Sequence, residues 1–492
     1  MLTAFLVFFP LAAALLLHFA KGGAARALAL GAALLEFVVA VYAAISFSRT
    51  GSAGLDLNVN WIASAGINFH LGIDGLSLCL VLLTTFLVPI ILLTAFRHEE
   101  YENPGAFYAL VLFMQTGLLG VFTAMDAFVF YFFWEVALIP IYFLAGAWSR
   151  SDRRIQITFK FFLYTIIGSL FMLAGFVYLY LQTTPAAGSM AAHSSDIQAM
   201  YAAGHQLEAA QQSWLFWLIF AAFAVKMPIF PFHTWQPDTY TESPAPATML
   251  LSGIKLKMGI YGCLRWLLPI VPKGVSQWQQ LVMVLAIIGI IYGAIIAIRQ
   301  RDMKRLIAYS SLSHVGLMIA GVFSLKAIGL QGAVVQMLAH GVNVVGMFLV
   351  ADAIERRTGS RYMPDLGGLT RRTPLLSVCF LVMLLSTVAL PLTGGFVGEF
   401  LLLEGVYEFN MWAGAIAGLT IIFSAVYLLR MYQRTMLGPD STYSETITDL
   451  GGAELFMFGA LIVLVFWLGL FPGTFLHLSE PVTSQILTLV GR

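Results

Sequence analysis

Long apolar blocks separated by short polar stretches run along the whole chain. A membrane-spanning helix needs about 20 consecutive apolar residues, and windows of this length pick out about 14 spans. Their approximate centres are residues 10, 36, 85, 114, 137, 170, 223, 255, 288, 313, 341, 390, 422 and 464. The pattern predicts an all-α membrane protein with these spans. Because no long polar linker divides the blocks, we expect one polytopic membrane domain over residues 1–492.

Two polar segments are longer than a connection between spans requires. Residues 55–71, "LDLNVNWIASAGINFHL", alternate apolar and polar positions in two runs, which predicts a β-hairpin outside the membrane. Residues 183–212 are polar, and we expect a short surface helix within them. The alternative for both segments is a simple loop that covers the helices.

The composition agrees with the span pattern and excludes a soluble protein. The chain is 60% hydrophobic and 10% charged, whereas soluble domains carry about 25% charged residues. The formal net charge of +1 argues neither for nor against nucleic acid, and the basic residues lie in loops and not in one patch. We expect no nucleic-acid partner. The three cysteines, Cys79, Cys263 and Cys379, lie in apolar segments without metal or redox spacing, and we interpret them as small core residues.

The lysines and arginines predict the orientation of the spans. We assign each lysine and arginine to a loop between two spans and place successive loops on opposite sides of the membrane. About 18 of the 26 basic residues then fall on one side and about 5 on the other. The larger group includes the clusters at 150–154, 299–305 and 356–372. The positive-inside rule makes this side internal, so both termini are expected on the external or periplasmic side. This bias, with the Ala- and Gly-rich composition, favours a bacterial inner membrane.

Three spans contain residues that interrupt helices. They are "VKMPIFPFHTW" with Pro228 and Pro231, "MLAHGVNVVGM" with Gly341 and Gly346, and "TVALPLTGGFVGEF" with Pro391. Irregular backbone at membrane depth persists where it is buried in protein or lines a wet cavity, and transporters place such breaks in corresponding halves. The offset between the first and last break suggests five-helix repeats over 105–268 and 278–436. Prolines that merely kink packed helices are the alternative.

Ionisable residues lie deep in several of these spans. A lysine at the bilayer centre costs roughly 2.5–3.5 kcal/mol on insertion scales, so such residues are functional candidates by default. Glu36 and Lys255 are better explained as structural, interfacial or packing residues. The stronger candidates are Glu135, Lys226, Lys257, His314, His340 and Glu399.

The spacing of the polar residues indicates hydrated stripes. Gln336, His340 and Asn343 stand at i, i+4 and i+7, which places them on one helix face. Lys255 and Lys257 are two positions apart, so in a regular helix they point to nearly opposite sides. A buried lysine whose acidic partner comes and goes can take up and release a proton near neutral pH, and histidines can relay it.

The sequence contains no motif that is typical of redox or hydrolytic enzymes. The sequence shows no phosphate-binding loop, dinucleotide fingerprint, iron–sulfur cysteine cluster or haem-type histidine pairs. We therefore expect no cofactor here and a pump driven by an ion gradient or by partner subunits.

Four motifs resemble a known family. "FWEVALIP", "KMPIFPFHTWQPDTYTESPAPATMLLSGIKLKMGIYG", "KRLIAYSSLSHVG" and "LPLTGGFVGEF" are similar to the antiporter-like subunits of respiratory complex I and of multisubunit sodium/proton antiporters. The resemblance runs from about residue 70 onward and includes "LGIDGLSL" at 71–78. Glu399, where other branches usually have lysine, and the lack of a long C-terminal lateral helix favour the M-type branch of the bacterial NADH:quinone oxidoreductase, the counterpart of mitochondrial subunit 4.

The resemblance implies a fold of 14 helices with two inverted five-helix repeats and discontinuous helices. It implies that Glu135 tunes a central Lys226, that Lys257, His314 and His340 relay protons, and that Glu399 is the terminal residue. NADH, FMN, iron–sulfur clusters and quinone would be bound by partner subunits.

The expected partners are the neighbouring L and N antiporter-like subunits, which the external hairpin would clasp, together with lipids. The expected function is proton translocation coupled to electron transfer in those partner subunits. A sodium/proton antiporter subunit, a membrane arm of a hydrogenase or ferredoxin-linked complex, and a purely structural subunit are the alternatives.

Overall fold

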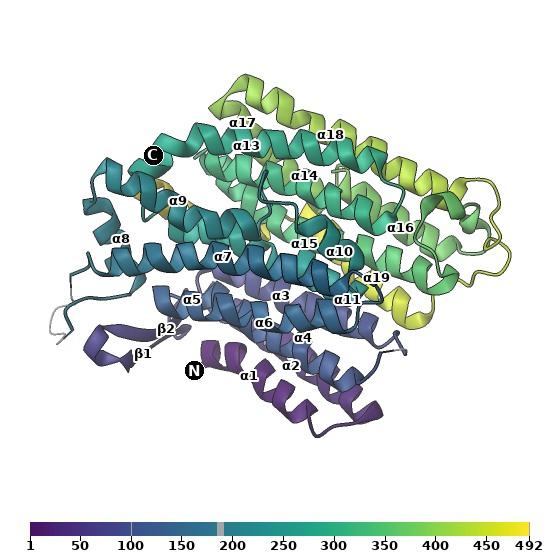
Figure 1. The fold of residues 1–492 in the computed structure, drawn as a ribbon, viewed down its shortest axis with the longest axis horizontal. Helices are drawn as coiled ribbons and strands as arrows, with labels where there is room; N and C mark the ends of the chain where they lie inside the picture. Colours follow the sequence, from purple (N-terminus) through teal and green to yellow (C-terminus); the bar gives the residue numbers. More distant parts are fainter. Residues whose placement is uncertain (100, 185–190, 492) are drawn as a thin grey trace. The chain divides into compact units, whose positions relative to one another are not determined.

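The computed structural model describes residues 1–99, 101–184 and 191–491. Figure 1 shows the helices and the hairpin of the chain. The contacts between residues divide the chain into two compact units. Unit 1 comprises Met1–Met227, Ile254–Gln280 and Leu478–Arg492, and unit 2 comprises Pro228–Gly253 and Leu281–His477. The predicted repeats, 105–268 and 278–436, and the single membrane domain over 1–492 remain predictions.

Unit 1 is built from helices and one hairpin. Its elements are α1 (Leu2–Leu17), α2 (Gly22–Thr50), β1 (Asp56–Ile62), β2 (Ile67–Gly72), α3 (Gly75–Ala95), α4 (Pro104–Thr123), α5 (Ala127–Val136), α6 (Leu138–Ala147), α7 (Arg154–Tyr180), α8 (Ile197–Gln206), α9 (Ala209–Lys226) and α12 (Lys257–Gly262). Helix α4 packs against α1, α2, α3, α5 and α6, and α7 packs against α9. The apolar core of this unit therefore surrounds α4.

The regular elements that the structure describes in unit 2 are helices. Its elements are α10 (Gln236–Glu242), α11 (Ala245–Leu250), α14 (Met303–Phe323), α15 (Ala327–Thr358), α16 (Pro374–Thr387), α17 (Gly394–Phe409), α18 (Met411–Tyr432) and α19 (Gly452–Leu470). Helices α13 (Pro272–Arg299) and α20 (Gly473–Val490) begin in one unit and end in the other. Helix α15 is buried along its apolar window and packs against α11, α14, α16, α17 and α19.

Ten helices in the described part of the chain are long and apolar enough to cross a membrane. Two shorter apolar helices, α1 and α16, coincide with the first and twelfth predicted spans. The prediction of an all-α membrane protein with discontinuous helices is confirmed. The count of 14 spans and the inverted repeats stay predictions.

Two of the three expected helix breaks occur and one does not. Helix α9 ends at Lys226 and α10 begins at Gln236, while α16 ends at Thr387 and α17 begins at Gly394. Helix α15, however, is continuous over 32 residues, so the break expected at its glycines is wrong. A Cβ on Gly346 would lie 2.2 Å from Met383 Cε. This glycine therefore allows close packing on α16 instead of interrupting the helix.

The predicted hairpin and surface helix are both present. Strands β1 and β2 pair antiparallel, with Asp56 opposite Gly72 and a register shift between Asn60 and Ile62. Helix α8 is the surface helix expected within 183–212, of which residues 185–190 lie outside the described residues. The three cysteines are buried and free, as expected for core residues.

His70 fastens the hairpin to α8. Its Nε2 lies 2.9 Å from Asp56 Oδ1, and its Nδ1 lies 2.8 Å from Oδ2 of Asp196, the residue that caps α8. Burial alone would lower the pKa of His70, but the hydrogen bonds and charges of Asp196 and Asp56 outweigh burial and raise this pKa above its ordinary 6.5.

The attachment of the hairpin is expected to depend on pH. Because the pKa of His70 is raised on folding, its contribution is fully present below pH 6.5 and is lost as the pH rises through the raised pKa. Amide hydrogen exchange of residues 56–72, corrected for the intrinsic pH dependence, should therefore accelerate across that window, by at most about fivefold for these partly exposed pairs. His70→Gln should abolish the dependence, whereas an unchanged profile in that variant would assign it to another group.

Candidate functional site

Asp126 positions the helix that carries Glu135. Its Oδ1 accepts hydrogen bonds from the backbone N–H groups of Phe128 (2.9 Å) and Val129 (3.2 Å), which caps the first turn of α5. Burial raises the pKa of this carboxyl, although the capping hydrogen bonds oppose the shift. Glu135 follows two turns later at the end of α5, where Pro140 removes a backbone donor and the helix resumes as α6. Glu135 thus lies at a helix interruption.

Lys226 is the last residue of α9 and is 3% exposed. Pro228 and Pro231 follow it and cannot donate backbone hydrogen bonds, so the helix ends at this point. The sequence therefore places a buried ammonium group at the end of a broken helix.

Aromatic rings take the place of an acidic partner around two lysines in unit 1. The Lys226 Nζ lies 4.6 Å from the ring centroid of Trp134, and the Lys255 Nζ lies 4.3 Å from that of Phe161. Neither ammonium has a hydrogen-bond partner among the described residues. The charge of Glu135 nevertheless acts on both lysines, and the two lysines act on each other. One carboxylate thus faces two lysines without a fixed ion pair.

Lys255 is the functional candidate that sequence reasoning set aside. Lys255 and Lys257 were expected to point to opposite sides of a regular helix, with Lys257 as the functional one. Both are buried, but the charges of Lys226 and Glu135 act on Lys255. The eighth span contains two π-helical segments, Leu251–Lys255 and Cys263–Leu267, which change the angular spacing of its residues. Positions counted on an α-helix therefore misplace its side chains.

Replacing Lys255 by methionine is expected to separate stability from activity. A buried cation without a hydrogen-bond partner destabilises the fold, so Lys255→Met should raise the melting temperature or leave it unchanged. The same change removes a charge beside Glu135 and Lys226, so the proton transport expected from the sequence motifs should fall several-fold when it is measured as acidification of membrane vesicles. Lys21→Met, at an exposed lysine, is the matched control. Wild-type activity in Lys255→Met would make this lysine a packing residue.

The second group of buried polar residues lies in unit 2, between α14, α15 and α17. The Nδ1 of His314 lies 2.8 Å from Oε1 of Glu399, and both side chains are at most 2% exposed. The two ring nitrogens of His314 have no hydrogen-bond partner among the described residues, so this contact is a close approach without a regular hydrogen bond. Gln336 Nε2 donates to the same Oε1 at 3.4 Å. The pair can hold one proton, either as imidazolium with carboxylate or as imidazole with carboxylic acid.

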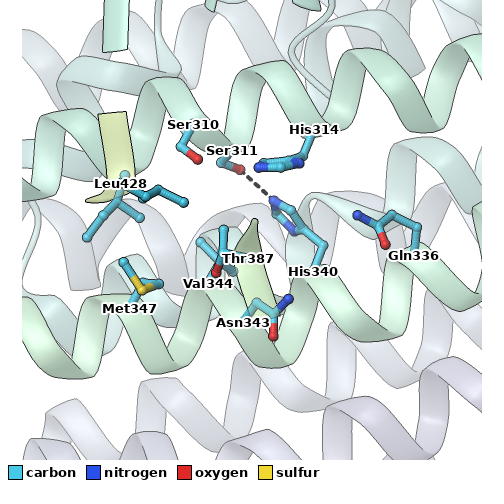
Figure 2. Close-up of a pocket in the computed structure, with 11 residues that line it drawn as sticks. Ser310, Ser311, His314, Gln336, His340, Asn343, Val344, Met347, Thr387 and Leu428 are labelled. Atoms are coloured by element: carbon cyan, nitrogen blue, oxygen red, sulfur yellow. Dashed lines mark hydrogen bonds between the residues drawn. The ribbon is translucent and has the colours of Figure 1, made fainter. Parts of the chain in front are cut away.

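His340 extends this group along α15. Its Nε2 lies 3.0 Å from the Ser311 Oγ, and its ring centroid lies 6.3 Å from that of His314 (Figure 2). A small cavity of about 20 Å³ is lined by Ser310, Ser311, His314, Gln336, His340 and Asn343 together with apolar side chains. That volume is sufficient for about one water molecule, which could bridge neighbouring polar groups. The polar stripe predicted from residues 336, 340 and 343 is therefore present.

A close approach of α15 and α17 brings Glu399 to the histidines. A Cβ on Gly398 would lie 2.2 Å from the Gln336 Oε1 and 2.9 Å from the Gln336 Cα. Only a residue without a Cβ permits the two helices to approach this closely. The glycine-rich motif before Glu399 thus serves the packing of the site as well as the helix break.

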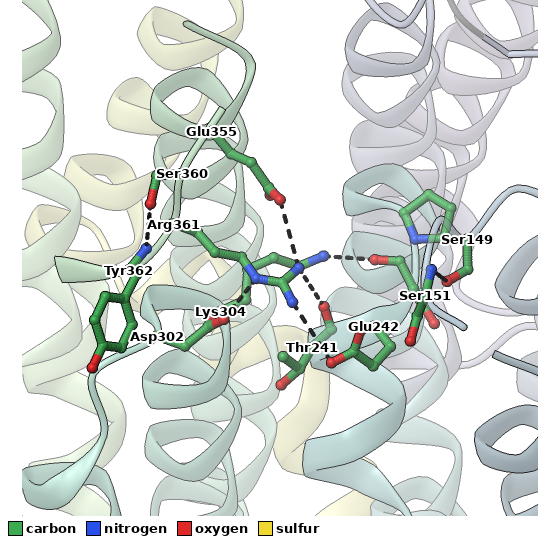
Figure 3. Close-up of polar contacts among 12 residues, drawn as sticks. Ser149, Ser151, Thr241, Glu242, Asp302, Lys304, Glu355, Ser360, Arg361 and Tyr362 are labelled. Atoms are coloured by element: carbon green, nitrogen blue, oxygen red, sulfur yellow. Dashed lines mark hydrogen bonds and ion pairs between the residues drawn. The ribbon is translucent and has the colours of Figure 1, made fainter. Parts of the chain in front are cut away.

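Two basic residues form hydrogen bonds with α10, the helix that follows the break in the seventh span. Arg361 Nε donates to Asp302 Oδ2 at 2.6 Å and its Nη1 donates to the carbonyl of Thr241 at 2.9 Å, while Lys304 Nζ donates to the carbonyl of Ser243 at 2.6 Å (Figure 3). These carbonyls lie at the C-terminal end of α10, where cations are favourable. These three hydrogen bonds fix α10 to the N-terminal end of α14 within unit 2.

The predicted site residues are divided between the two units. Glu135, Lys226 and Lys257 belong to unit 1, and His314, His340 and Glu399 belong to unit 2. Glu36, in α2, is fully buried, and neither carboxylate oxygen has a hydrogen-bond partner among the described residues. Across those same residues, no group of three or more His, Cys, Asp and Glu side chains could hold a metal ion.

Comparisons with known proteins agree with the motifs. A family model described as "NADH:quinone oxidoreductase/Mrp antiporter, TM" matches residues 124–424. NADH-quinone oxidoreductase subunit M of Rickettsia typhi is 36% identical over 457 residues, covering 92% of this chain and 90% of the relative. The subunit M of Rhodobacter capsulatus is 35% identical over 496 residues, covering 99% of this chain and 96% of the relative.

Solved structures give the same assignment. A chain of respiratory complex I from Thermus thermophilus superposes with a TM-score of 0.90 at 32% identity, and all of both chains is covered. A chain of the Mrp complex from Dietzia sp. DQ12-45-1b shares the fold, with a TM-score of 0.84 at 22% identity over 100% of this chain and 99% of that one. The expected resemblance to M-type subunits is confirmed by the curated relatives. This chain belongs to the family of membrane subunits of NADH:quinone oxidoreductases and Mrp antiporters.

Proposed function

We propose that this chain is a proton-translocating membrane-arm subunit of an NADH:quinone oxidoreductase. The observation that carries the proposal is that each unit contains several buried ionisable side chains. The chain's full-length relatives are named as subunits of that enzyme. Buried charges of this kind are costly in a membrane protein and mark ion pathways. Electron transfer would occur in partner subunits, which would bind NADH, FMN, iron–sulfur clusters and quinone.

Each buried residue has a role in the proposal. Glu135 tunes the charge of Lys226, and the absence of a fixed ion pair leaves that lysine free to exchange its proton as its surroundings change. Lys257 and the histidines relay protons, and Glu399 with His314 forms the terminal group. The neighbouring subunits would be those of L and N type. A bacterial inner membrane with both termini on the periplasmic side completes the assignment.

A native-locus deletion complemented with this chain tests the proposal. Membrane vesicles are given NADH and a quinone acceptor, their acidification is recorded, and sodium tolerance of the same strains is measured. Loss of NADH-driven acidification in the deletion strain, restored by the complementing chain, is the expected result. Unchanged acidification together with reduced sodium tolerance would instead assign the chain to a sodium/proton antiporter.

A further inference from the structure

A cavity of about 1100 Å³ in unit 2 is lined by four arginines. Arg299 is the last residue of α13 and Arg301 follows two positions later, while Arg430 lies in the last turn of α18 and Arg434 in the π-helical segment Gln433–Leu437 that continues it. The rest of the lining comes from the segment around Met363 and from residues near Gly438, together with apolar positions of both helices. The cavity is open and lies entirely within unit 2.

These arginines differ from the paired arginines of the same unit. Arg356, Arg357, Arg361 and Arg371 each form an ion pair with a carboxylate. Among the described residues, none of the four cavity arginines does. Arg301 donates to the hydroxyl of Tyr362 at 3.1 Å, and Arg430 Nη1 is 3.4 Å from the carbonyl of Ile298. The cavity thus concentrates positive charge without an internal counter-charge.

Exposed apolar side chains lead up to the arginines on both helices. Ile295 on α13 is 52% exposed, and Ile422, Val426 and Leu429 on α18 are 58, 46 and 45% exposed. Both helices are apolar enough to span a membrane, and each changes from exposed aliphatic residues to arginine near its C-terminal end. This order, apolar wall and then cationic rim, matches acyl chains below a phosphate.

We propose that the Arg299–Arg301–Arg430–Arg434 cavity binds the phosphate headgroup of an anionic phospholipid. The planar guanidinium groups offer paired N–H donors that match phosphate oxygens, and the missing carboxylates leave these donors available. The exposed aliphatic residues on α13 and α18 contact the acyl chains. This feature favours a lipid over a soluble phosphate, which would gain nothing from the apolar wall. The site is independent of the proton-transfer residues.

Native mass spectrometry of the full chain in neutral detergent tests the proposal. The chain is titrated with phosphatidylglycerol or with zwitterionic phosphatidylethanolamine, and retained lipid is counted. Wild type should retain phosphatidylglycerol preferentially. R430Q/R434Q should weaken this retention about thirtyfold, since each arginine near the headgroup contributes about fivefold. R430K/R434K keeps the charge and should recover most of the retention, and R153Q/R372Q removes two exposed arginines that do not line the cavity and should have no effect.

Several other results would contradict phospholipid binding in this cavity. Equal retention of both lipids, or an undiminished preference in R430Q/R434Q, would overturn the proposal. Displacement of phosphatidylglycerol by millimolar inorganic phosphate would assign the site to a soluble phosphate. A photo-crosslinker at Leu429 that captures another subunit in the intact complex, and no lipid, would make this cavity a protein interface. A misfolded variant is recognised by a lowered melting temperature in lipid-free detergent, and R299Q then replaces it in the same comparison.

Discussion

Lys226→Met is expected to leave the enzyme assembled but to reduce quinone-linked NADH oxidation by about a hundredfold, the lower range for loss of a positioned proton-transfer group. Methionine fills a similar volume and needs no hydrogen bond, so the packing against Trp134 is retained. It cannot carry a proton, and Glu135 then loses one of the two lysines on which its charge acts. If electron transfer and proton transfer are tightly coupled, the quinone-linked rate falls together with pumping. The rate is measured on complex recovered from a native gel.

Two controls make this result specific. NADH oxidation by an artificial acceptor that bypasses quinone should be unchanged in Lys226→Met, because the electron-transfer subunits are intact. Lys226→Arg keeps the charge but holds its proton permanently, so it should also fail if proton exchange matters. Full quinone-linked activity in the arginine variant would show that a fixed positive charge is sufficient, and would remove Lys226 from the proton path.

Glu399→Gln is expected to produce the second large loss, again about a hundredfold in quinone-linked activity. The amide keeps the size of the side chain and its contact with Gln336, but it cannot take up a proton. His314 then loses the carboxylate 2.8 Å from its Nδ1, so its imidazolium form would be buried without a counter-charge. The group between α14, α15 and α17 would then lack the carboxyl group that we propose as a proton carrier.

Glu408→Gln is the matched control for this variant, because Glu408 lies on the same helix and is exposed. It should have wild-type activity. Glu399→Asp retains a carboxylate one methylene further from the histidine and should recover part of the activity. If Glu399→Gln pumps normally while its melting temperature falls, Glu399 is a structural partner of His314 and not a proton carrier.

Features of the fold that depend on local chemistry could be predicted from the sequence. The apolar windows identified the spans because bilayer thickness fixes helix length. Alternating polarity identified the hairpin at 55–71, and Pro228 and Pro391 identified breaks because proline lacks a backbone donor. The ionisable residues were visible because a charge within an apolar run is rare. Asp126 could also have been found, since an aspartate before an apolar run is a helix-capping signal.

Features that depend on packing between helices could not be predicted from the sequence. Gly346 was expected to interrupt its helix, but it allows close packing against Met383. Met383 is distant in sequence, so this contact could not be foreseen. The π-helical segments of the eighth span leave no marked pattern, so α-helical spacing could only place Lys255 and Lys257 on nearly opposite sides, and the choice of Lys257 came from the resemblance. The pairing of His314 with Glu399 joins residues 85 positions apart, and only the geometry shows that contact.

The most direct test of the central claim is NADH-driven acidification of inverted membrane vesicles from a strain carrying Lys226→Met at the native locus. Assembly of the complex is checked on a native gel in parallel. A buried lysine that exchanges protons predicts normal assembly and loss of acidification. Normal assembly with acidification equal to wild type would contradict the claim, because protons would then be moved without Lys226.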